Sequence, residues 1–382
     1  MALGLIARIR GERETVGIDV GHYSIKYVKV YHDANGKRIV REVDLEPVPA
    51  GSIINGLIQR RDSEDLTAEN GAKKEKDGFD KLGEAFSKLM LRHPIDENVD
   101  VVASVNCVAG EGGVLVDRLS IKVPKNGNEE AIIVQTAQSR PPFDDQDNVL
   151  DYEVVSREGD EVKVNVVAAK SSMLDSWAQF FTRKGIRLSA LDVDIFGLLN
   201  AFAMTATDEE RKKTTAIFNI GDNKMSVGFM QDGAFHSVRS MNGGSLNVII
   251  NKLSSSLDIP AEKCHEMFEK NDLKVVEGVA ISVLEDAMKV AFEELMSQIT
   301  FGIRYHSSAE DSRPLERILI GGGGASVPGL LQYIADKTGI ETATVNPFRS
   351  VECDSSVVDK EGMSVALSNI YAPALGLAMR KF

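Results

Sequence analysis

The alternation of apolar and polar positions near the N-terminus predicts three strands joined by tight turns. Their sequences are TVGIDV from Thr15, SIKYVKVY from Ser24 and RIVREVDL from Arg38. Each stretch is rich in β-branched residues, and the short turns GHY and HDANGK separate them. We therefore expect an antiparallel meander at the start of the chain.

The same order of parts returns after Thr215. The sequence there reads TAIFNI, the turn GDNK, MSVGFM, the turn QDGA and FHSVRS. In both copies a polar residue, Asp19 or Asn219, stands two positions before a glycine, Gly21 or Gly221, at the end of the first strand. A duplicated meander predicts two lobes of similar build that face each other.

A glycine run lies between a further strand and a helix. Arg317–Ile320 predicts a buried strand, Gly321–Gly324 a loop of bare backbone, and Val327–Lys337 a helix. We expect Ser326 to cap this helix, with Pro328 in its first turn. This order lets a flat ring or a phosphate approach the main chain. The Gly-Lys-Ser/Thr of a Walker A loop is missing from this run.

Between the meanders, the pattern predicts a small inserted α+β module. The expected elements are strands at Val101–Val105 and Val114–Val123, a helix at Glu129–Ser139 opened by Asn128, a hairpin around the turn REGD, and a helix in SSMLDSWAQFFTRKG. We expect the aromatic residues of that last helix, Trp177, Phe180 and Phe181, to belong to the core.

After the second meander the pattern becomes helical, with two shorter helices followed by a long one. Gly243 and Gly244 open this part; they suit a helix N-terminus that faces phosphate, and an ordinary turn equally well. The stretch Glu262–Lys270 suits the adenine edge of a nucleotide, and equally a solvated charged face.

These patterns divide the chain into four parts. We expect a first-lobe core in residues 1–104 and 189–210, an inserted subdomain in 105–188, a second-lobe core in 211–245 and 312–382, and a helical subdomain in 246–311. Whether the last helix returns to the first lobe is left open. The segment Arg60–Lys81 is polar and without periodicity, which predicts an exposed loop.

Composition narrows the class of protein. The 382 residues, 43% hydrophobic and 26% charged, are typical of a soluble globular chain of two to three domains. The net charge of −13 argues against a general polyanion binder, so we expect no nucleic-acid partner. Cys107, Cys264 and Cys353 are odd in number and far from histidines at ligand spacing, which indicates a reducing cytoplasm rather than a disulfide or zinc framework.

No segment of the sequence approaches the ~20 apolar residues that span a bilayer. The apolar stretch Ala2–Ala7 is shorter than a signal-peptide core, and it suits a frayed terminus or a short interfacial helix. We therefore expect no direct membrane insertion, and any membrane association to go through a partner or a weak surface contact.

The two glycine turns predict a phosphate clamp. Gly21 and Gly221 let the backbone bend sharply, so that successive N–H groups point into a concavity that suits phosphate oxygens. Either turn alone is also explained as an ordinary hairpin, and their shared order favours the clamp. The flanking groups that suit it are the hydroxyls of Ser24 and Ser226, the cations of Lys26 and Lys224, and the carboxylate of Asp19 for a hydrated Mg²⁺.

The ordered motifs resemble the actin-like ATPase superfamily. They read GIDVGHYSIKYVKV, LDVDIFGLLNAF, FNIGDNKMSVGFMQDG, MNGGS, ILIGGGGASVPGL and APALGLAMR. More closely, they are similar over nearly the whole chain to the PilM family, the actin-like proteins of type IV pilus assembly. The resemblance implies a two-lobed α/β actin-like ATPase fold with an FtsA-like inserted α+β subdomain, and ATP with Mg²⁺ in the cleft.

Carried over residue by residue, the resemblance implies a set of nucleotide-binding residues. They are Asp19, Gly21, His22, Tyr23, Ser24 and Lys26 in the first phosphate loop, Asn219, Gly221, Asp222, Asn223 and Lys224 in the second, Gly322, Gly323 and Gly324 in the adenosine loop, and Gly243 and Gly244. Asp194 falls where the superfamily often has a carboxylate near the metal. Asn219 departs from the usual Asp, and an amide cannot accept a proton beside the metal, so we expect binding with slow or absent hydrolysis.

The resemblance also implies partners and a location. The family docks the short cytoplasmic tail of a bitopic inner-membrane protein, PilN, in a groove by the inserted subdomain, and it links the membrane alignment complex to the cytoplasmic motor. This places the chain in the cytoplasm, peripheral at the inner face of the inner membrane. Two further partners stay open: the motor ATPase itself, and a second copy of the chain in weak self-association.

Two alternatives of the same fold stay open beside this nucleotide-binding adaptor. A small-molecule kinase needs a catalytic acid or base for its acceptor, and Asp194 is the one convincing candidate. An FtsA-type division or cytoskeletal protein carries a C-terminal amphipathic helix after a linker, whereas this sequence ends in GLAMRKF. In the adaptor, ATP is expected to close the two lobes and so to set the surface offered to partners.

Overall fold

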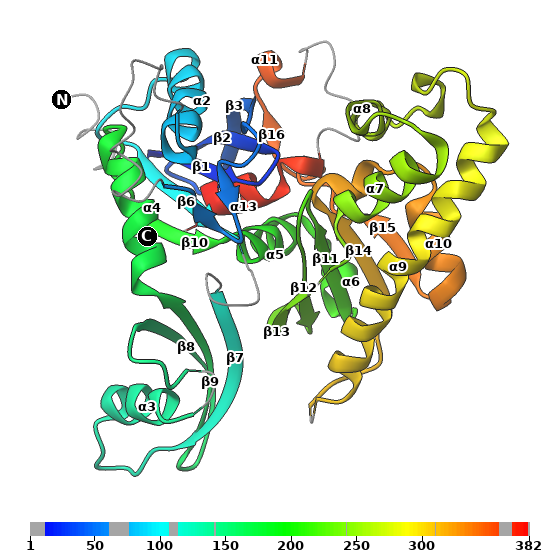
Figure 1. The fold of residues 1–382 in the computed structure, drawn as a ribbon. Coiled ribbons are helices and arrows are strands. Elements are labelled where there is room, and N and C mark those ends of the chain that lie inside the picture. The colour runs from blue at the N-terminus through cyan, green and yellow to red at the C-terminus, as the bar shows by residue number, and fades with distance from the viewer. Residues whose placement is uncertain are drawn as a thin grey trace, which may run out of the picture.

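Two mixed sheets with the same strand order form the frame of the molecule (Figure 1). The computed structural model describes residues 12–60, 76–106, 114–140, 143–241, 243–309, 311–358 and 369–380. The first sheet has the order β10-β6-β1-β2-β3-β16. Read from the other end and without its edge strand β16, this order corresponds to that of the second sheet, β13-β12-β11-β14-β15. The first-lobe strands are β1 (Arg13–Val20), β2 (Ser24–His32), β3 (Arg38–Pro47), β6 (Asp100–Val105), β10 (Ala190–Val193) and β16 (Glu352–Cys353), with a small hairpin of β4 (Ile53–Ile54) and β5 (Leu57–Ile58).

The second-lobe strands are β11 (Thr215–Ile220), β12 (Met225–Gln231), β13 (Ala234–Met241), β14 (Arg317–Gly321) and β15 (Glu341–Thr344). β11 pairs antiparallel with β12 and parallel with β14, just as β1 pairs antiparallel with β2 and parallel with β6. The equivalent residues Asp19 and Asn219 lie opposite Lys26 and Ser226. The duplication predicted from the sequence is therefore confirmed at the level of strand register.

Two helices form a layer between the sheets, α5 (Asp194–Thr205) and α13 (Ala372–Ala378). α13 packs against β1 and β2, so the end of the described chain returns to the first lobe. α5 lies on the second sheet, where a methyl group added to Gly228 would stand 2.7 Å from Leu199 Cδ2. The two helices touch so closely that a methyl group on Gly376 would lie 1.7 Å from the Gly197 carbonyl oxygen.

The outer face of the first sheet is covered by α2 (Gly78–Arg92) and α4 (Ser171–Arg183). Rings from both helices meet there edge to face, with the centroids of Phe86 and Phe180 5.5 Å apart. The core placement expected for Trp177, Phe180 and Phe181 is confirmed, because all three are buried. Since α4 packs into the first-lobe core, we propose to count it with that lobe rather than with the insertion.

The insertion itself is a three-stranded sheet of order β7-β9-β8 with one helix on one face (Figure 1). Its elements are β7 (Val114–Lys122), α3 (Glu129–Gln138), β8 (Asn148–Glu158) and β9 (Glu161–Lys170). The expected cap is present: the Asn128 side chain accepts a hydrogen bond from the Ala131 amide. β8 is an edge of this sheet, and β7 contacts β13 of the second lobe.

Helices cover the outer face of the second sheet. They are α7 (Leu246–Leu257), α8 (Ala261–Lys270), the 3-10 turn η2 (Leu273–Val275), the long α9 (Ile281–Ser307) and α10 (Leu330–Thr338). α6 (Asp208–Lys212) links the lobes, and α11 (Ser355–Val358) adjoins β3. The buried stripe of α9 includes Leu284, Met288, Ala291, Leu295 and Ile299, spaced three or four residues apart as one face of a helix requires.

Three expectations from the sequence are wrong. The glycine run does not lead straight into a helix at Val327: Gly322–Ser326 is a 3-10 turn, and α10 begins at Leu330 after Gly329, which has φ 75°. Ser326 caps no helix, because its hydroxyl donates to the Gly323 carbonyl at 2.8 Å within the turn. The loop expected over Arg60–Lys81 ends early, since α2 starts at Gly78 on an Asp77 cap and includes Lys81.

Several sequence features lie outside the described residues, namely Ala2–Ala7, the middle of the Arg60–Lys81 segment and Cys107. Within the described part, no helix is long and apolar enough to cross a bilayer.

Candidate functional site

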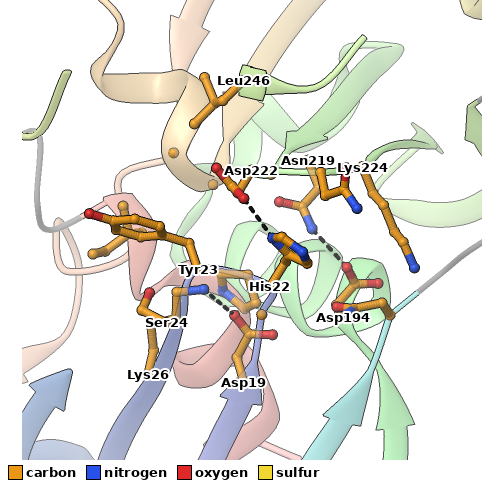
Figure 2. Close-up of a pocket in the computed structure, with 18 of the residues that line it drawn as sticks. Asp19, His22, Tyr23, Ser24, Lys26, Asp194, Asn219, Asp222, Lys224 and Leu246 are labelled. Carbon is orange, nitrogen blue, oxygen red and sulfur yellow. Dashed lines mark hydrogen bonds and ion pairs between the residues drawn. The ribbon is translucent and has the colours of Figure 1, made fainter. Parts of the chain in front are cut away.

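A cavity of about 360 Å³ lies between the two lobes, where β1 and β11 end (Figure 2). Gly21 N donates to Ser24 O at 3.0 Å and Gly221 N donates to Lys224 O at 2.8 Å, so both turns close in the same way. The two bends therefore face one common cavity. The predicted residues that line it are Asp19, Gly21, His22, Tyr23, Ser24, Lys26, Asp194, Asn219, Gly221, Asp222, Asn223, Lys224, Gly322 and Gly323.

Three predicted glycines do not line this cavity, Gly243, Gly244 and Gly324. A methyl group on Gly324 would stand 2.5 Å from Ile220 Cβ, and one on Gly244 would stand 2.8 Å from the Met225 methyl carbon. Both glycines permit close packing inside the second lobe, and Gly243, with φ 132°, turns the chain into α7 beside Gln298.

Asp19 is held by groups of the first lobe. Ser104 Oγ on β6 donates to its Oδ1 at 2.8 Å, and Lys26 Nζ on β2 lies 3.2 Å from its Oδ2. The residue is 4% exposed. The paired strands bring this cation beside the carboxylate, which removes most of the cost of burying the charge.

Asp194 and Asn219 connect the lobes on the other side of the cavity. Asp194 is the first residue of α5, and its Oδ1 accepts the Ile195 amide at 2.8 Å. Asn219 Nδ2, at the end of β11, donates to Asp194 Oδ2 at 3.1 Å. A carboxylate at a helix N-terminus is favoured by the helix dipole. The amide of Asn219 is thus the donor that a second carboxylate could not supply.

A second contact between the lobes joins the two turns themselves (Figure 2). His22 Nδ1 lies 2.7 Å from Asp222 Oδ2, and the Tyr23 ring stacks on the His265 ring with centroids 4.4 Å apart and planes 10° apart. Burial, together with the charge of Glu269 beside it, raises the pKa of the Tyr23 phenol to about 12.

The far end of the cavity is more apolar and has bare backbone. Gly322 has φ 70°, and a methyl group there would stand 2.6 Å from Asn219 Oδ1. A methyl group on Gly323 would stand 2.7 Å from Leu246 Cδ1. Only glycine therefore leaves this wall open, as a flat ring lying against it requires.

The sequence missed or left open part of the lining. Ser226, whose hydroxyl was predicted beside the second turn, also lines the cavity. Residues that line it beyond the predicted set are Leu45, Asn106, Leu246, His265, Phe268, Glu269, Ser326, Ile370 and Pro373. For the stretch Glu262–Lys270 the sequence suits the adenine edge of a nucleotide and a solvated charged face equally. In the structure α8 brings His265, Phe268 and Glu269 of this stretch to the cavity. Leu45 and Pro373 carry no local signal, because only the packing of β3 and α13 places them there.

The groups that line the cavity suit phosphate. They suit a metal ion only if that ion keeps most of its water ligands. Among the described residues no three His, Cys, Asp or Glu side chains come close enough to hold a metal by themselves. Mg²⁺ usually keeps several waters and binds through one or two carboxylates plus substrate phosphates. Asp19 and Asp194 fit that role, because both line the cavity and both are within reach of its solvent.

A second, larger cavity of about 880 Å³ forms a groove beside the insertion. Its lining comes from three parts of the molecule: β8 and β9 of the insertion, α4, β10 and α5 of the first lobe, and the β12–β13 turn of the second. The floor is apolar, with Val167, Ala169, Leu174, Leu191, Phe196, Leu199, Ala203, Met230 and Phe235.

The rim of this groove is acidic. Asp151, Glu153 and Asp175 stand exposed along it, and no ion pair of the described residues involves them. Arg380 is the sole basic side chain in the described lining, and its Nη1 lies 2.6 Å from Asp192 Oδ2. Burial raises the pKa of Asp192 despite this arginine, and the nearby charge of Asp151 raises it further.

Comparison with known proteins gives one family and several related folds. The family model described as "Type IV pilus assembly protein PilM" matches residues 17–382. Among solved structures, the PilM–PilN type IV pilus biogenesis complex is similar at 19% identity and TM-score 0.73, over 96% of this chain and 97% of that one.

Two other solved structures are less similar. The ethanolamine utilization protein EutJ from Carboxydothermus hydrogenoformans is 12% identical with TM-score 0.50, over 96% of this chain and 89% of its own. MreB5 of Spiroplasma citri, bound to AMPPNP, is 9% identical with TM-score 0.47, over 95% and 94% of the two chains. The first two matches confirm the two-lobed α/β actin-like fold that the motifs predict.

Proposed function

Because this chain belongs to the PilM family of type IV pilus assembly proteins, we propose that it is a nucleotide-binding adaptor of the pilus machine. In this proposal ATP with Mg²⁺ occupies the cavity between the lobes, and the groove beside the insertion holds the cytoplasmic tail of a PilN-type inner-membrane protein. That contact keeps the chain at the inner face of the membrane and links the membrane complex to the cytoplasmic motor.

The observation that carries the proposal is that one helix borders both cavities. Asp194 at the start of α5 lines the cavity between the lobes, while Phe196, Leu199 and Ala203 on the same helix line the groove. A rigid helix that touches two ligands is a direct physical route from one to the other. An adaptor that reads a nucleotide and presents a partner surface needs such an element.

The nucleotide part rests on the glycine turns and the charges between them. The turns at Gly21 and Gly221 present backbone to the same space, and Lys26 supplies a cation at its edge. A bound Mg²⁺ would neutralise phosphate charge beside Asp19 and Asp194. The wall of Gly322 and Gly323, facing Phe268 and Glu269, suits an adenine ring.

The kinase alternative is less well supported. A general base needs an oxygen that can take a proton from an acceptor. Both oxygens of Asp194 accept amide hydrogen bonds, from Asn219 and Ile195, which orient the carboxylate toward structure and leave only its remaining lone pairs for an acceptor. Phosphate release that rises on addition of sugars or acetate would favour the kinase and contradict the adaptor.

The partner part rests on the shape and charge of the groove. An extended peptide can bury apolar side chains on its floor, and a rim of three carboxylates, none in an ion pair with another described residue, favours basic residues beside them. We therefore expect the tail to carry apolar residues next to lysine or arginine. The solved structure of a complex with PilN supports a partner of this type.

Two variants separate the two sites. Asp19→Asn should abolish ATP binding measured by calorimetry and leave the affinity for a synthetic tail peptide unchanged. Asp151→Lys should weaken the tail peptide about tenfold and leave ATP binding unchanged. Glu158→Lys is the matched control, since Glu158 is exposed on the same strand and does not line the groove. Wild-type-like ATP affinity in Asp19→Asn would refute the nucleotide site.

A further inference from the structure

The two phosphate turns are tied to each other by side chains. His22 of the first turn and Asp222 of the second lie 2.7 Å apart, across the middle of the cavity (Figure 2). A carboxylate oxygen can only accept, so the imidazole Nδ1 is the donor. Asn247 Nδ2 also donates to Asp222 Oδ2, at 3.2 Å, and His265 Nε2 lies 3.6 Å from Asp222 Oδ1.

This arrangement places a buried anion where an anionic ligand has to come. The Asp222 side chain is 9% exposed, and its carboxylate stands in the same turn whose backbone is the candidate phosphate cradle. Two anions in such a site repel each other strongly unless cations or donors separate them. His22, at 30% side-chain exposure, is the donor that faces both Asp222 and the cavity.

We propose that His22 and Asp222 form an interlobe clasp that competes with nucleotide phosphate. Without nucleotide, His22 donates to Asp222 and holds the two turns together. When phosphate enters, His22 turns to it, and Asp222 keeps its bond from Asn247. Asp222 is then the residue that limits affinity for the triphosphate, and His22 the residue that recognises it. This inference rests on the proposed nucleotide site and adds the residues that set its selectivity.

The proposal predicts opposite effects for the two partners of one hydrogen bond. Asp222→Asn removes the competing anion, so the affinity for ATP should rise about tenfold. His22→Ala leaves the anion without its cross-lobe donor beside the phosphates, so the affinity should fall by a similar factor. A pair with a purely structural role would weaken binding in both variants.

Calorimetric titration of Mg-ATP into the wild-type chain and the two variants is the first measurement. The matched control is Asp311→Asn, which removes the ion pair between Lys163 of the insertion and Asp311 after α9, at 2.7 Å and outside the cavity. It should leave ATP affinity unchanged. Changes of the same sign in Asp222→Asn and His22→Ala would overturn the inference.

A second measurement needs no nucleotide. If the clasp holds the turns together, both variants should speed hydrogen exchange of the amides that follow Gly21 and Gly221 in the nucleotide-free protein, whereas Asp311→Asn should not. Unchanged exchange in both variants overturns the clasp whether or not ATP binds. If the wild-type chain binds no ATP and the amides nevertheless exchange faster in both variants, the proposed function is refuted and the clasp is supported as an interlobe contact.

Discussion

At the residue scale, the polar residue that ends the first strand of each lobe has a different environment in the two lobes. Asp19 faces Lys26, whereas Asn219 faces the carboxylate of Asp194. An aspartate at 219 would stand against a second carboxylate, and like charges at hydrogen-bond distance cannot both ionise without a cation between them. The asparagine therefore suits a site that is stable without metal.

This difference predicts a metal-dependent variant. Asn219→Asp should lower the free energy of unfolding by about 2 kcal/mol in EDTA, because a hydrogen bond to a charged group is replaced by repulsion. Mg-ATP should restore much of that loss, and phosphate release should rise. Urea unfolding with and without Mg-ATP measures the first effect. In the control Asn219→Ala, which adds no charge, Mg-ATP should recover no more stability than it gives the wild type; equal recovery in both variants would contradict the reasoning.

Buried histidines make the stability depend on pH. Burial lowers the pKa of His236 from 6.5 to about 4, and Arg118 and His306 beside it act in the same direction, against the weaker pull of Asp311. Burial likewise lowers the pKa of His32 to about 4. Below pH 6.5 the two histidines bind protons in the unfolded chain but not in the folded chain. Their contribution to the free energy of unfolding is therefore complete above pH 6.5 and is lost as the pH falls toward 4.

Urea unfolding between pH 4.5 and 7.5 tests this window. The wild type should lose stability steadily below pH 6.5, and His236→Gln should show a shallower slope because one of the titrating groups is gone. A His236→Gln slope identical to that of the wild type would show that His236 does not contribute. Arg349 is the chief cause of the lowered pKa of Glu210. The stability that this carboxylate contributes is therefore lost only at pH values below this window.

At the element scale, the contact between α5 and α13 depends on glycine. A methyl group on Gly376 would lie 1.7 Å from the carbonyl oxygen of Gly197 and 2.8 Å from the Ala201 nitrogen, and both are backbone atoms that cannot swing away. Gly376→Ala should therefore force the helices apart and lower the unfolding free energy by about 3 kcal/mol or more. Thermal or urea unfolding gives the measurement.

Gly302→Ala is the matched control for this substitution. Gly302 also lies within a helix, and its methyl group would meet Phe218 and Val227 at 3.4 Å, an ordinary contact. Removing a helix-interior glycine there should be neutral or stabilise by up to about 1 kcal/mol. Equal stability of the Gly376 and Gly302 variants would mean that the α5–α13 contact is looser than described.

The elements that the sequence predicts well are those whose signal is local. β1, β2, β11 and β12 follow from apolar runs bounded by glycine turns, and α3 follows from Asn128 and its periodicity. The start of α10 was missed because Gly329 takes a left-handed conformation, so the chain turns once more before the helix begins. A proline-glycine pair allows either outcome, so the sequence alone does not decide where the helix begins.

The site was predictable to the extent that it depends on those turns. The phosphate loops and Gly322 follow from strand ends that the topology brings together. Leu45, Ile370 and the stack of Tyr23 on His265 could not be foreseen, because they join segments far apart in sequence. The same holds for the Asn219–Asp194 hydrogen bond, which only the placement of α5 against β11 creates.

At the scale of the whole molecule, the groove and the cavity between the lobes are each lined by residues of more than one lobe. The groove takes Met230 and Phe235 from the second lobe and Val167 from the insertion, so any change in the angle between the lobes changes its width. The insertion also touches the second lobe directly, where β7 contacts β13. A ligand that binds one arrangement of these parts more tightly than another would therefore shift the shape of both cavities.

Thermodynamic linkage makes this coupling reciprocal. If Mg-ATP changes the affinity for a tail peptide by some factor, the peptide must change the affinity for Mg-ATP by the same factor. We expect a factor of about five or more, measured by titrating each ligand with and without a saturating amount of the other. Leu199→Ala should reduce this factor, because Leu199 fills the contact of α5 with Gly228 and lines the groove. Ala178→Ser, which changes the groove wall on α4 and leaves α5 intact, should keep the full coupling factor.

Binding constants that do not depend on the other ligand would mean that the two cavities act independently. The proposed adaptor would then carry its nucleotide for stability rather than as a signal.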